Sequence, residues 1–266
     1  MKILIMGLPG SGKTTLAQEL YDIMLNKVQM NWHNADNVRK LFEDWDFSDA
    51  GRLRQAQRMA DLAKLDKKNN IVSICEFICP TQKMREVFSC NGEPDYIIWL
   101  NTIKKGRYED TNKIFEPPTK YDYRITNFDA KGWAQRIAND ILNKKKPVQF
   151  DFRKPTVQML GRWQPWHDGH MALFNRALEK TGQVCIMIRD CQGWNDSNPF
   201  NADDVIDRIH KALGPKYYGQ YTIMIVPNIV NITYGRDVGY KIEQEVFDDA
   251  THSISATKIR KELGLS

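Results

Sequence analysis

The feature that most constrains the fold is a glycine-rich stretch, "GLPGSGKTTLA", which directly follows the short apolar run "KILIM". Gly7, Gly12, Lys13 and Thr14 fill the spacing G-x-x-x-x-G-K-[ST], which carries meaning where a strand leads into a helix. The run "KTTLAQELYDIML" has the apolar period of a helix, with Leu16 among the residues on one face. The first residues therefore predict a strand, a phosphate-binding loop and a helix.

Such a loop holds phosphates with backbone N–H groups, and the start of the helix adds partial positive charge. Lys13 would reach the outer phosphates of a nucleotide, and the Thr14 hydroxyl would hold Mg²⁺. We therefore predict ATP and Mg²⁺ as cofactors. The predicted phosphate-binding residues are Gly7, Gly10, Gly12, Lys13, Thr14 and Thr15.

The rest of the chain alternates short apolar runs with longer periodic segments, which is typical of a parallel sheet covered by helices. Strands are expected at "VQMNWH", "IVSIC" and "YIIWL", and long helices at "LRQAQRMADLAKLDKK" and "KGWAQRIANDIL". The basic stretch "NKKKPVQFDFRKP" then separates this part from a second α/β rhythm, with strands at "TVQML", "QVCIMI" and "YTIMIV" and helices from about Asp168 and Ala202. We predict two tandem α/β domains, 1–146 with a P-loop parallel sheet and 155–266 with a compact Rossmann-like sheet.

The segment "ADNVRK" follows the second expected strand, at the sheet edge where open α/β sheets bind ligands. Asp36 is predicted there as a catalytic residue that activates a substrate hydroxyl, or as a ligand of Mg²⁺ together with Thr14. The alternative is structural, since Asp is also a favoured N-cap for the helix that follows.

The first half resembles the adenylylsulfate kinases in the order of "GLPGSGKTTLA", "ADNVR", "DFSDAGRLRQAQRMADLAKL" and "IVSICEFICPTQKMRE". That resemblance implies phosphorylation of the 3′-hydroxyl of adenylyl sulfate by MgATP. It implies that Phe47 stacks on the substrate adenine and that Arg39 and Arg52 bind its phosphosulfate. Asn34 stands where the family pattern has its first Asp, and the stretch "EDTNKIFEPPTKYD" differs from the family's lid.

The second half contains "GRWQPWHDGH", with His167 and His170 spaced H-x-x-H at a strand-to-helix junction. Two imidazoles at a helix start can stabilise charge that develops on a phosphate under attack. Far downstream, "SISATKIRK" offers hydroxyls and cations at another predicted helix start; alone it would be a capped amphipathic helix. We predict His167 and His170 as catalytic, alongside Lys13 and Asp36.

Together these two segments resemble the HxGH nucleotidylyltransferases, and with "NPF" they are most similar to compact nicotinamide-mononucleotide adenylyltransferases. This resemblance implies that a phosphomonoester attacks the α-phosphate of ATP and releases pyrophosphate. Trp194 would stack on the acceptor base, although packing is the alternative, and Asp237 in "YGRDVG" is a further substrate-binding candidate. The nucleotide-binding residues implied are Gly161, Arg162, Ser255, Thr257, Lys258 and Arg260.

Three other functions stay open at this point. The "GRD" segment is similar to one in ATP sulfurylases, so the chain is alternatively a minimal PAPS synthetase, with sulfurylase and kinase joined. A second alternative is a riboside kinase joined to a mononucleotide adenylyltransferase for NAD synthesis. The third is a nucleotide sensor that binds ATP without turnover.

Composition fits an enzyme of small nucleotides. The 266 residues are 42% hydrophobic and 27% charged, with a net charge of +5, and no apolar run approaches the ~20 residues that span a bilayer. Five cysteines form no paired framework, which favours free thiols. We expect a cytoplasmic protein with small-molecule nucleotide substrates and without nucleic-acid or membrane partners, and leave a homo-oligomer open.

Overall fold

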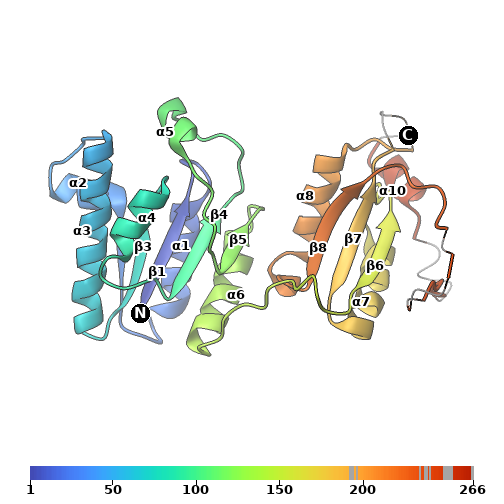
Figure 1. The fold of residues 1–266 in the computed structure, drawn as a ribbon, viewed down its shortest axis with the longest axis horizontal. Coiled ribbons are helices and arrows are strands. Elements are labelled where there is room, and N and C mark those ends of the chain that lie inside the picture. The colour runs from blue at the N-terminus through green and yellow to red at the C-terminus, as the bar shows by residue number, and fades with distance from the viewer. Residues whose placement is uncertain are drawn as a thin grey trace. The chain divides into compact units, whose positions relative to one another are not determined.

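The computed structural model describes residues 1–191, 195, 197–233, 235–236, 239, 241–247 and 254–264 of the chain. The chain folds into two compact units, 1–147 and 148–266, and each has a parallel sheet with helices packed on it (Figure 1). Within the described ranges, no helix combines the length and the apolar character that crossing a bilayer requires.

The first unit contains a five-stranded sheet in the order β2-β3-β1-β4-β5, and every pairing is parallel. Its strands are β1 (Lys2–Gly7), β2 (Met30–Asn34), β3 (Val72–Glu76), β4 (Tyr96–Leu100) and β5 (Tyr123–Ile125). In a parallel sheet the carboxyl ends of the strands meet at one edge, so the loops after β1, β2 and β3 lie together there.

Helices cover this sheet because its central strand is apolar on both faces. They are α1 (Lys13–Met24), α2 (Ala35–Leu41), α3 (Asp49–Lys68), α4 (Gln82–Ser89), α5 (Glu109–Ile114) and α6 (Ala130–Leu142). Leu4 and Met6 of β1 pack with Met59 of α3 and Phe88 of α4 in one core. Alternation along the strand turns Ile3 and Ile5 to the other face, and both are fully buried.

The second unit contains a three-stranded parallel sheet in the order β6-β7-β8. Its elements are β6 (Val157–Gly161), α7 (Asp168–Thr181), β7 (Val184–Arg189), α8 (Ala202–Leu213), the 3-10 turn η1 (Pro215–Tyr217), β8 (Tyr221–Val226) and α10 (Ala256–Glu262). Val184, Ile186 and Ile188 of β7 are buried in one core with Phe174 of α7 and Ile209 of α8.

The expected strands and long helices are confirmed, including helix starts at Asp168 and Ala202. Four elements were not expected: α4, α5, β5 and the 3-10 turn η1. They are short or polar, so their hydrophobic period is weak. Of these, α5 proves to border the candidate site.

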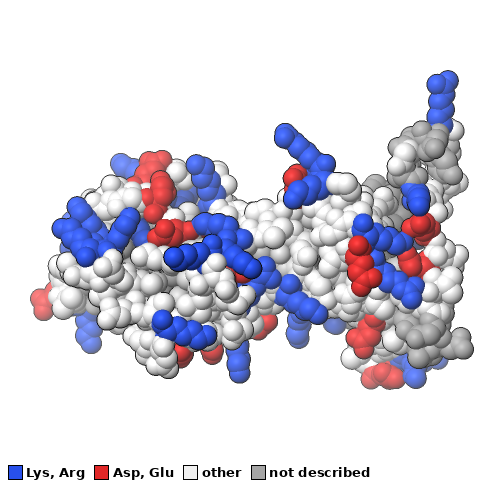
Figure 2. Space-filling model, turned by 90° about the horizontal axis from the view of Figure 1, so that it is seen from below, with Lys and Arg blue, Asp and Glu red and all other residues white. Residues whose placement is uncertain are grey.

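Charged side chains of both signs are dispersed over the molecule. On the face drawn in Figure 2, Lys and Arg side chains lie over both units with Asp and Glu side chains among them. The described part of this face therefore mixes the two signs of charge.

Candidate active sites

The turn between β1 and α1 depends on glycine. Gly7 has a φ of 148°, and a Cβ there would lie 2.4 Å from the carbonyl oxygen of Leu100. Gly12 has a φ of 92° and is the N-cap of α1, which has no side-chain cap. The first N–H groups of a helix have no intrahelical acceptor, so this uncapped end is suited to bind an anion.

Lys13 is buried at the base of this loop. Its Nζ donates a hydrogen bond to the carbonyl oxygen of Leu8 at 3.0 Å. Burial lowers the pKa of Lys13 to about 8, although the carboxylates of Glu76 and Asp36 act to raise it. The ammonium therefore lies where a phosphate could bind, and its burial makes the charged form less stable than in water.

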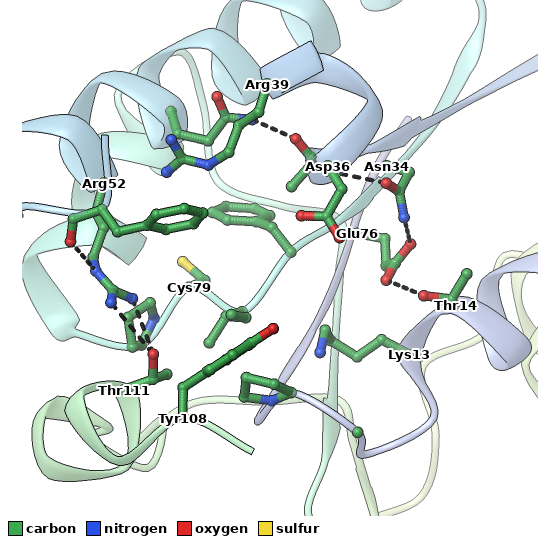
Figure 3. Close-up of a pocket in the computed structure, with 18 of the residues that line it drawn as sticks. Lys13, Thr14, Asn34, Asp36, Arg39, Arg52, Glu76, Cys79, Tyr108 and Thr111 are labelled. Carbon is green, nitrogen blue, oxygen red and sulfur yellow. Dashed lines mark hydrogen bonds between the residues drawn. The ribbon is translucent and has the colours of Figure 1, made fainter. Parts of the chain in front are cut away.

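Glu76, at the end of β3, joins the loop to β2. Its Oε1 accepts a hydrogen bond from Thr14 Oγ1 at 2.8 Å, and its Oε2 accepts one from Asn34 Nδ2 at 2.6 Å (Figure 3). Glu76 is only 4% exposed, and both of these donors are neutral. Glu76 was not among the residues predicted from the sequence, although a lone acidic residue that ends an apolar strand beside the P-loop strand is a usable signal.

Asn34, rather than Asp36, caps α2. The Asn34 Oδ1 accepts hydrogen bonds from the backbone N–H groups of Asp36 and Asn37, at 3.0 and 3.1 Å. Asp36 therefore lies inside the first turn of α2, and the alternative of Asp36 as the N-cap is wrong. Its carboxylate is left to line the cavity beside Lys13.

The loops at this sheet edge enclose a cavity of about 820 Å³. It brings together the sequence-predicted residues Gly10, Gly12, Lys13, Thr14, Thr15, Asp36, Arg39, Phe47 and Arg52. Figure 3 shows Lys13, Thr14, Asp36 and Glu76 on one side of it and Arg39 and Arg52 on the other. The arrangement has one end suited to a polyphosphate and another suited to a second ligand.

That second end combines an aromatic ring with two guanidinium groups. The guanidinium carbons of Arg39 and Arg52 lie 4.6 and 5.9 Å from the centre of the Phe47 ring, which is half exposed. Burial lowers the pKa of Arg39, the carboxylate of Asp44 opposes this, and the charge of Arg52 lowers it further. Two buried like charges on one cavity wall favour an anionic ligand between them.

In the second unit, the loop from β6 to α7 brings the two predicted histidines together. The His167 and His170 rings are stacked, with centroids 3.6 Å apart. His167 is the N-cap of α7, and its Nδ1 accepts a hydrogen bond from the N–H of Gly169 at 3.1 Å. A neutral His167 therefore carries its proton on Nε2.

Burial favours the neutral form of both imidazoles. Burial lowers the pKa of His167, and the Asp168 carboxylate opposes this. Burial and the neighbouring His167 lower the pKa of His170 to about 3. The Nδ1 atom of His170 is buried without a hydrogen-bond partner among the described residues.

Helix α10 contacts the histidine loop across 96 residues of sequence. Arg260, 7% exposed, donates from Nη1 to the carbonyl oxygen of Gln164 at 2.7 Å and from Nη2 to Thr257 Oγ1 at 3.1 Å. Ser255 is the N-cap of α10, without a side-chain hydrogen bond in the described part of the chain, and Lys258 is exposed on its first turn. The two predicted phosphate segments thus meet.

The same loop holds the "NPF" segment. The Gln164 side chain donates to the carbonyl oxygen of Phe200 at 2.7 Å and accepts from its N–H at 3.0 Å. Arg162 Nη1 donates to Asn198 Oδ1 at 3.4 Å, and Gly161 is the last residue of β6. A cavity of about 420 Å³ lies beside this segment, lined in part by Arg189. Trp194 and Asp237 lie outside the described residues.

Comparisons with known proteins find relatives of the part of the chain that contains the first of these sites. The sequence model of the family Adenylylsulphate kinase matches residues 1–97. A probable adenylyl-sulfate kinase of Aeropyrum pernix is 32% identical over 106 residues, which cover 39% of this chain and 58% of that protein. The first unit therefore contains an adenylylsulfate kinase-like P-loop domain.

The relatives also include a protein of a different enzyme class. The nicotinamide-nucleotide adenylyltransferase of Methanococcus vannielii is 37% identical over 68 residues, 25% of this chain and 40% of that protein. The chain spans less than two thirds of the length of these curated relatives. Among solved structures, an adenylylsulfate kinase of Mycobacterium tuberculosis in complex with AMPPNP and APS matches at 20% identity and a TM-score of 0.47, over 54% of this chain and 98% of that one.

Proposed function

We propose that residues 1–146 are an ATP-dependent kinase domain that phosphorylates a hydroxyl of a nucleotide-like acceptor, with adenylyl sulfate favoured. One observation carries this proposal. Lys13, Thr14 and Asp36 line the same cavity as Arg39, Phe47 and Arg52, so a phosphate donor and an aromatic, anionic acceptor can meet in it. The match of residues 1–97 to the adenylylsulfate kinases supports it.

The chemistry follows from where the charges lie. The P-loop N–H groups and the Lys13 ammonium bind the outer phosphates and offset charge on the transferred phosphoryl group. The Asp36 carboxylate accepts the proton of the acceptor hydroxyl as the oxygen attacks the γ-phosphorus, and ADP leaves. Phe47 stacks on the acceptor base, while Arg39 and Arg52 bind its anionic group.

The residues beside the P-loop fit Mg²⁺. Mg²⁺ prefers hard oxygen ligands and is usually bound by one or two carboxylates together with substrate phosphates. Thr14, Asp36 and Glu76 supply such oxygens, and Glu76 is buried between two neutral donors. Among the described residues, no group of three or more His, Cys, Asp or Glu side chains forms a metal cluster without substrate. When bound, the cation would neutralise charge on the phosphates.

The kinase proposal is tested by incubating the protein with MgATP and adenylyl sulfate. The expected products are ADP and 3′-phosphoadenylyl sulfate. Nicotinamide riboside serves as the competing acceptor, and its phosphorylation in place of adenylyl sulfate would support the riboside kinase alternative. ATP binding without any phosphorylated product would support the nucleotide sensor.

For residues 155–266 we infer an adenylyltransferase domain that joins AMP to a phosphomonoester, with nicotinamide mononucleotide favoured. The observation that supports this inference is the hydrogen bond from Arg260 to the loop that holds the stacked His167 and His170. An acceptor phosphate oxygen attacks the α-phosphorus of ATP, the bond to the β-phosphate breaks, and pyrophosphate leaves. The imidazole N–H groups stabilise charge that grows on the α-phosphate.

The adenylyltransferase proposal is tested by pyrophosphate release. ATP with nicotinamide mononucleotide is expected to yield NAD and pyrophosphate. A parallel reaction contains ATP and sulfate in place of the mononucleotide. Pyrophosphate release with sulfate but not with the mononucleotide would support the minimal PAPS synthetase.

A further inference from the structure

Arg52 is a buried cation on the wall of the kinase cavity, and it already has an anion. Its side chain is 8% exposed, and its Nη2 lies 2.6 Å from Asp110 Oδ2. Its Nε donates to the carbonyl oxygen of Phe47 at 2.7 Å, and both Nη atoms donate to Thr111 Oγ1 at 3.3 Å. The only formal negative charge in this set is the Asp110 carboxylate.

The two ends of this ion pair differ in solvation. The Asp110 side chain is 67% exposed, whereas that of Arg52 is nearly covered. A carboxylate that is mostly in water can leave the pair at small cost, but an unpaired buried guanidinium is costly. Phe47 and Thr111 would keep the guanidinium in place, so the structure favours the exchange of one anion for another at Arg52.

Asp110 comes from α5, which is separate from the P-loop and from the helices that carry Arg39 and Arg52. Tyr108, Asp110 and Thr111 line the cavity together with Arg52. Figure 3 shows Tyr108 and Thr111 on the Arg52 side of the cavity. An acceptor whose anionic group binds at Arg52 therefore lies beside residues of α5. The sequence here reads "RYEDTNK", with two adjacent acidic residues at the start of α5.

We propose that Asp110 is a specificity-determining residue, an internal anion that occupies Arg52 and must be displaced by the anionic group of the acceptor. This inference rests on the proposed kinase function. Release of α5 is then coupled to binding of an anion, and an acceptor without one leaves the Arg52–Asp110 pair intact.

Inorganic sulfate is the first probe, titrated into the full chain with the P-loop saturated by a non-hydrolysable ATP analogue. Asp110→Asn is expected to tighten sulfate binding about tenfold, the size of one charge-assisted hydrogen bond. Glu109→Gln is the matched control, because it removes the same charge from the neighbouring position; it is expected to change sulfate binding less than about twofold, since exposed charges are screened. Unchanged or weaker sulfate binding in Asp110→Asn, with an unaltered melting temperature, would overturn the proposal.

Nucleoside probes then separate this proposal from the kinase proposal. Asp110→Asn is expected to strengthen the binding of adenylyl sulfate as it strengthens the binding of sulfate, and to leave the binding of adenosine unchanged. An equal increase in affinity for adenylyl sulfate and adenosine would contradict displacement at Arg52. Absence of phosphoryl transfer to adenylyl sulfate in the wild type would contradict the kinase function alone, because the sulfate titration still decides the role of Asp110.

Discussion

Asn34 and Glu76 form a hydrogen-bonded pair at the edge of the first sheet. The family pattern has an Asp at position 34, but here the side chain is an amide that caps α2 and donates to the Glu76 carboxylate. That Lys13 and Thr14 lie at this cavity was predictable from the P-loop spacing, and that Asp36 lies there was predictable from its place after the second strand. Glu76 was missed although it ends an expected strand, whereas Asp110 was not predictable because it lies on α5, which the sequence pattern did not predict.

The Glu76 carboxylate is expected to strengthen metal binding. Glu76→Gln should weaken Mn²⁺ binding to the complex with a non-hydrolysable ATP analogue by about ten- to a hundredfold, measured by electron paramagnetic resonance. Adding Asn34→Asp should restore much of it, because the amide and the carboxylate then exchange positions. A double variant that binds Mn²⁺ as weakly as Glu76→Gln would contradict this role.

The Lys13 pKa predicts a pH dependence for ATP binding. Burial lowers this pKa to about 8, so the phosphate-binding ammonium is present below pH 8 and is lost as the pH rises through it. The ATP affinity of the free protein should fall about tenfold between pH 7 and pH 9, if only the charged form binds. Lys13→Ala is the control and should bind ATP weakly, with an affinity that does not change between pH 7 and pH 9. Calorimetric titrations of ATP at several pH values measure both affinities.

At the scale of elements, strands with continuous apolar runs were the easiest to predict, and β4 begins and ends where "YIIWL" does. β5 has only three residues, and α5 has six residues of which five are polar, so neither shows a clear hydrophobic period. The meeting of α10 with the loop after β6 was expected only from the resemblance. Its physical basis is the buried Arg260, which donates a hydrogen bond to the carbonyl oxygen of Gln164, 96 residues earlier in the chain.

Arg260→Gln should therefore loosen α10. The loss of a charged donor to a carbonyl oxygen costs about 1.5–3 kcal/mol, so hydrogen–deuterium exchange should accelerate in α10 and in the loop at Gln164. Adenylyl transfer should fall with it. Lys258→Gln changes an exposed cation on the same helix and should leave the exchange in the loop unchanged. Equal exchange in wild type and Arg260→Gln would refute the contact as a tether.

At the scale of the molecule, the sequence pattern indicated two α/β rhythms and the basic, proline-bounded stretch between them. The structure has two compact units, and each brings together residues that the sequence predicts to bind phosphate. The acceptor substrate of each unit could not be predicted from the sequence, because the shape and charge of a cavity depend on loops that are distant in the sequence. In the first unit the cavity walls come from segments as far apart as Asp36 and Asp110.

Two separate phosphate sites predict separable activities. His170→Ala should lower adenylyl transfer by on the order of a hundredfold or more, because it removes a group that stabilises charge in the transition state. Phosphoryl transfer should persist in this variant, since Lys13 and His170 belong to different compact units. Lys13→Ala should show the reverse pattern. Assays of ADP and of pyrophosphate on each variant measure the two reactions in parallel, and loss of both from either substitution would mean that a single site serves both reactions.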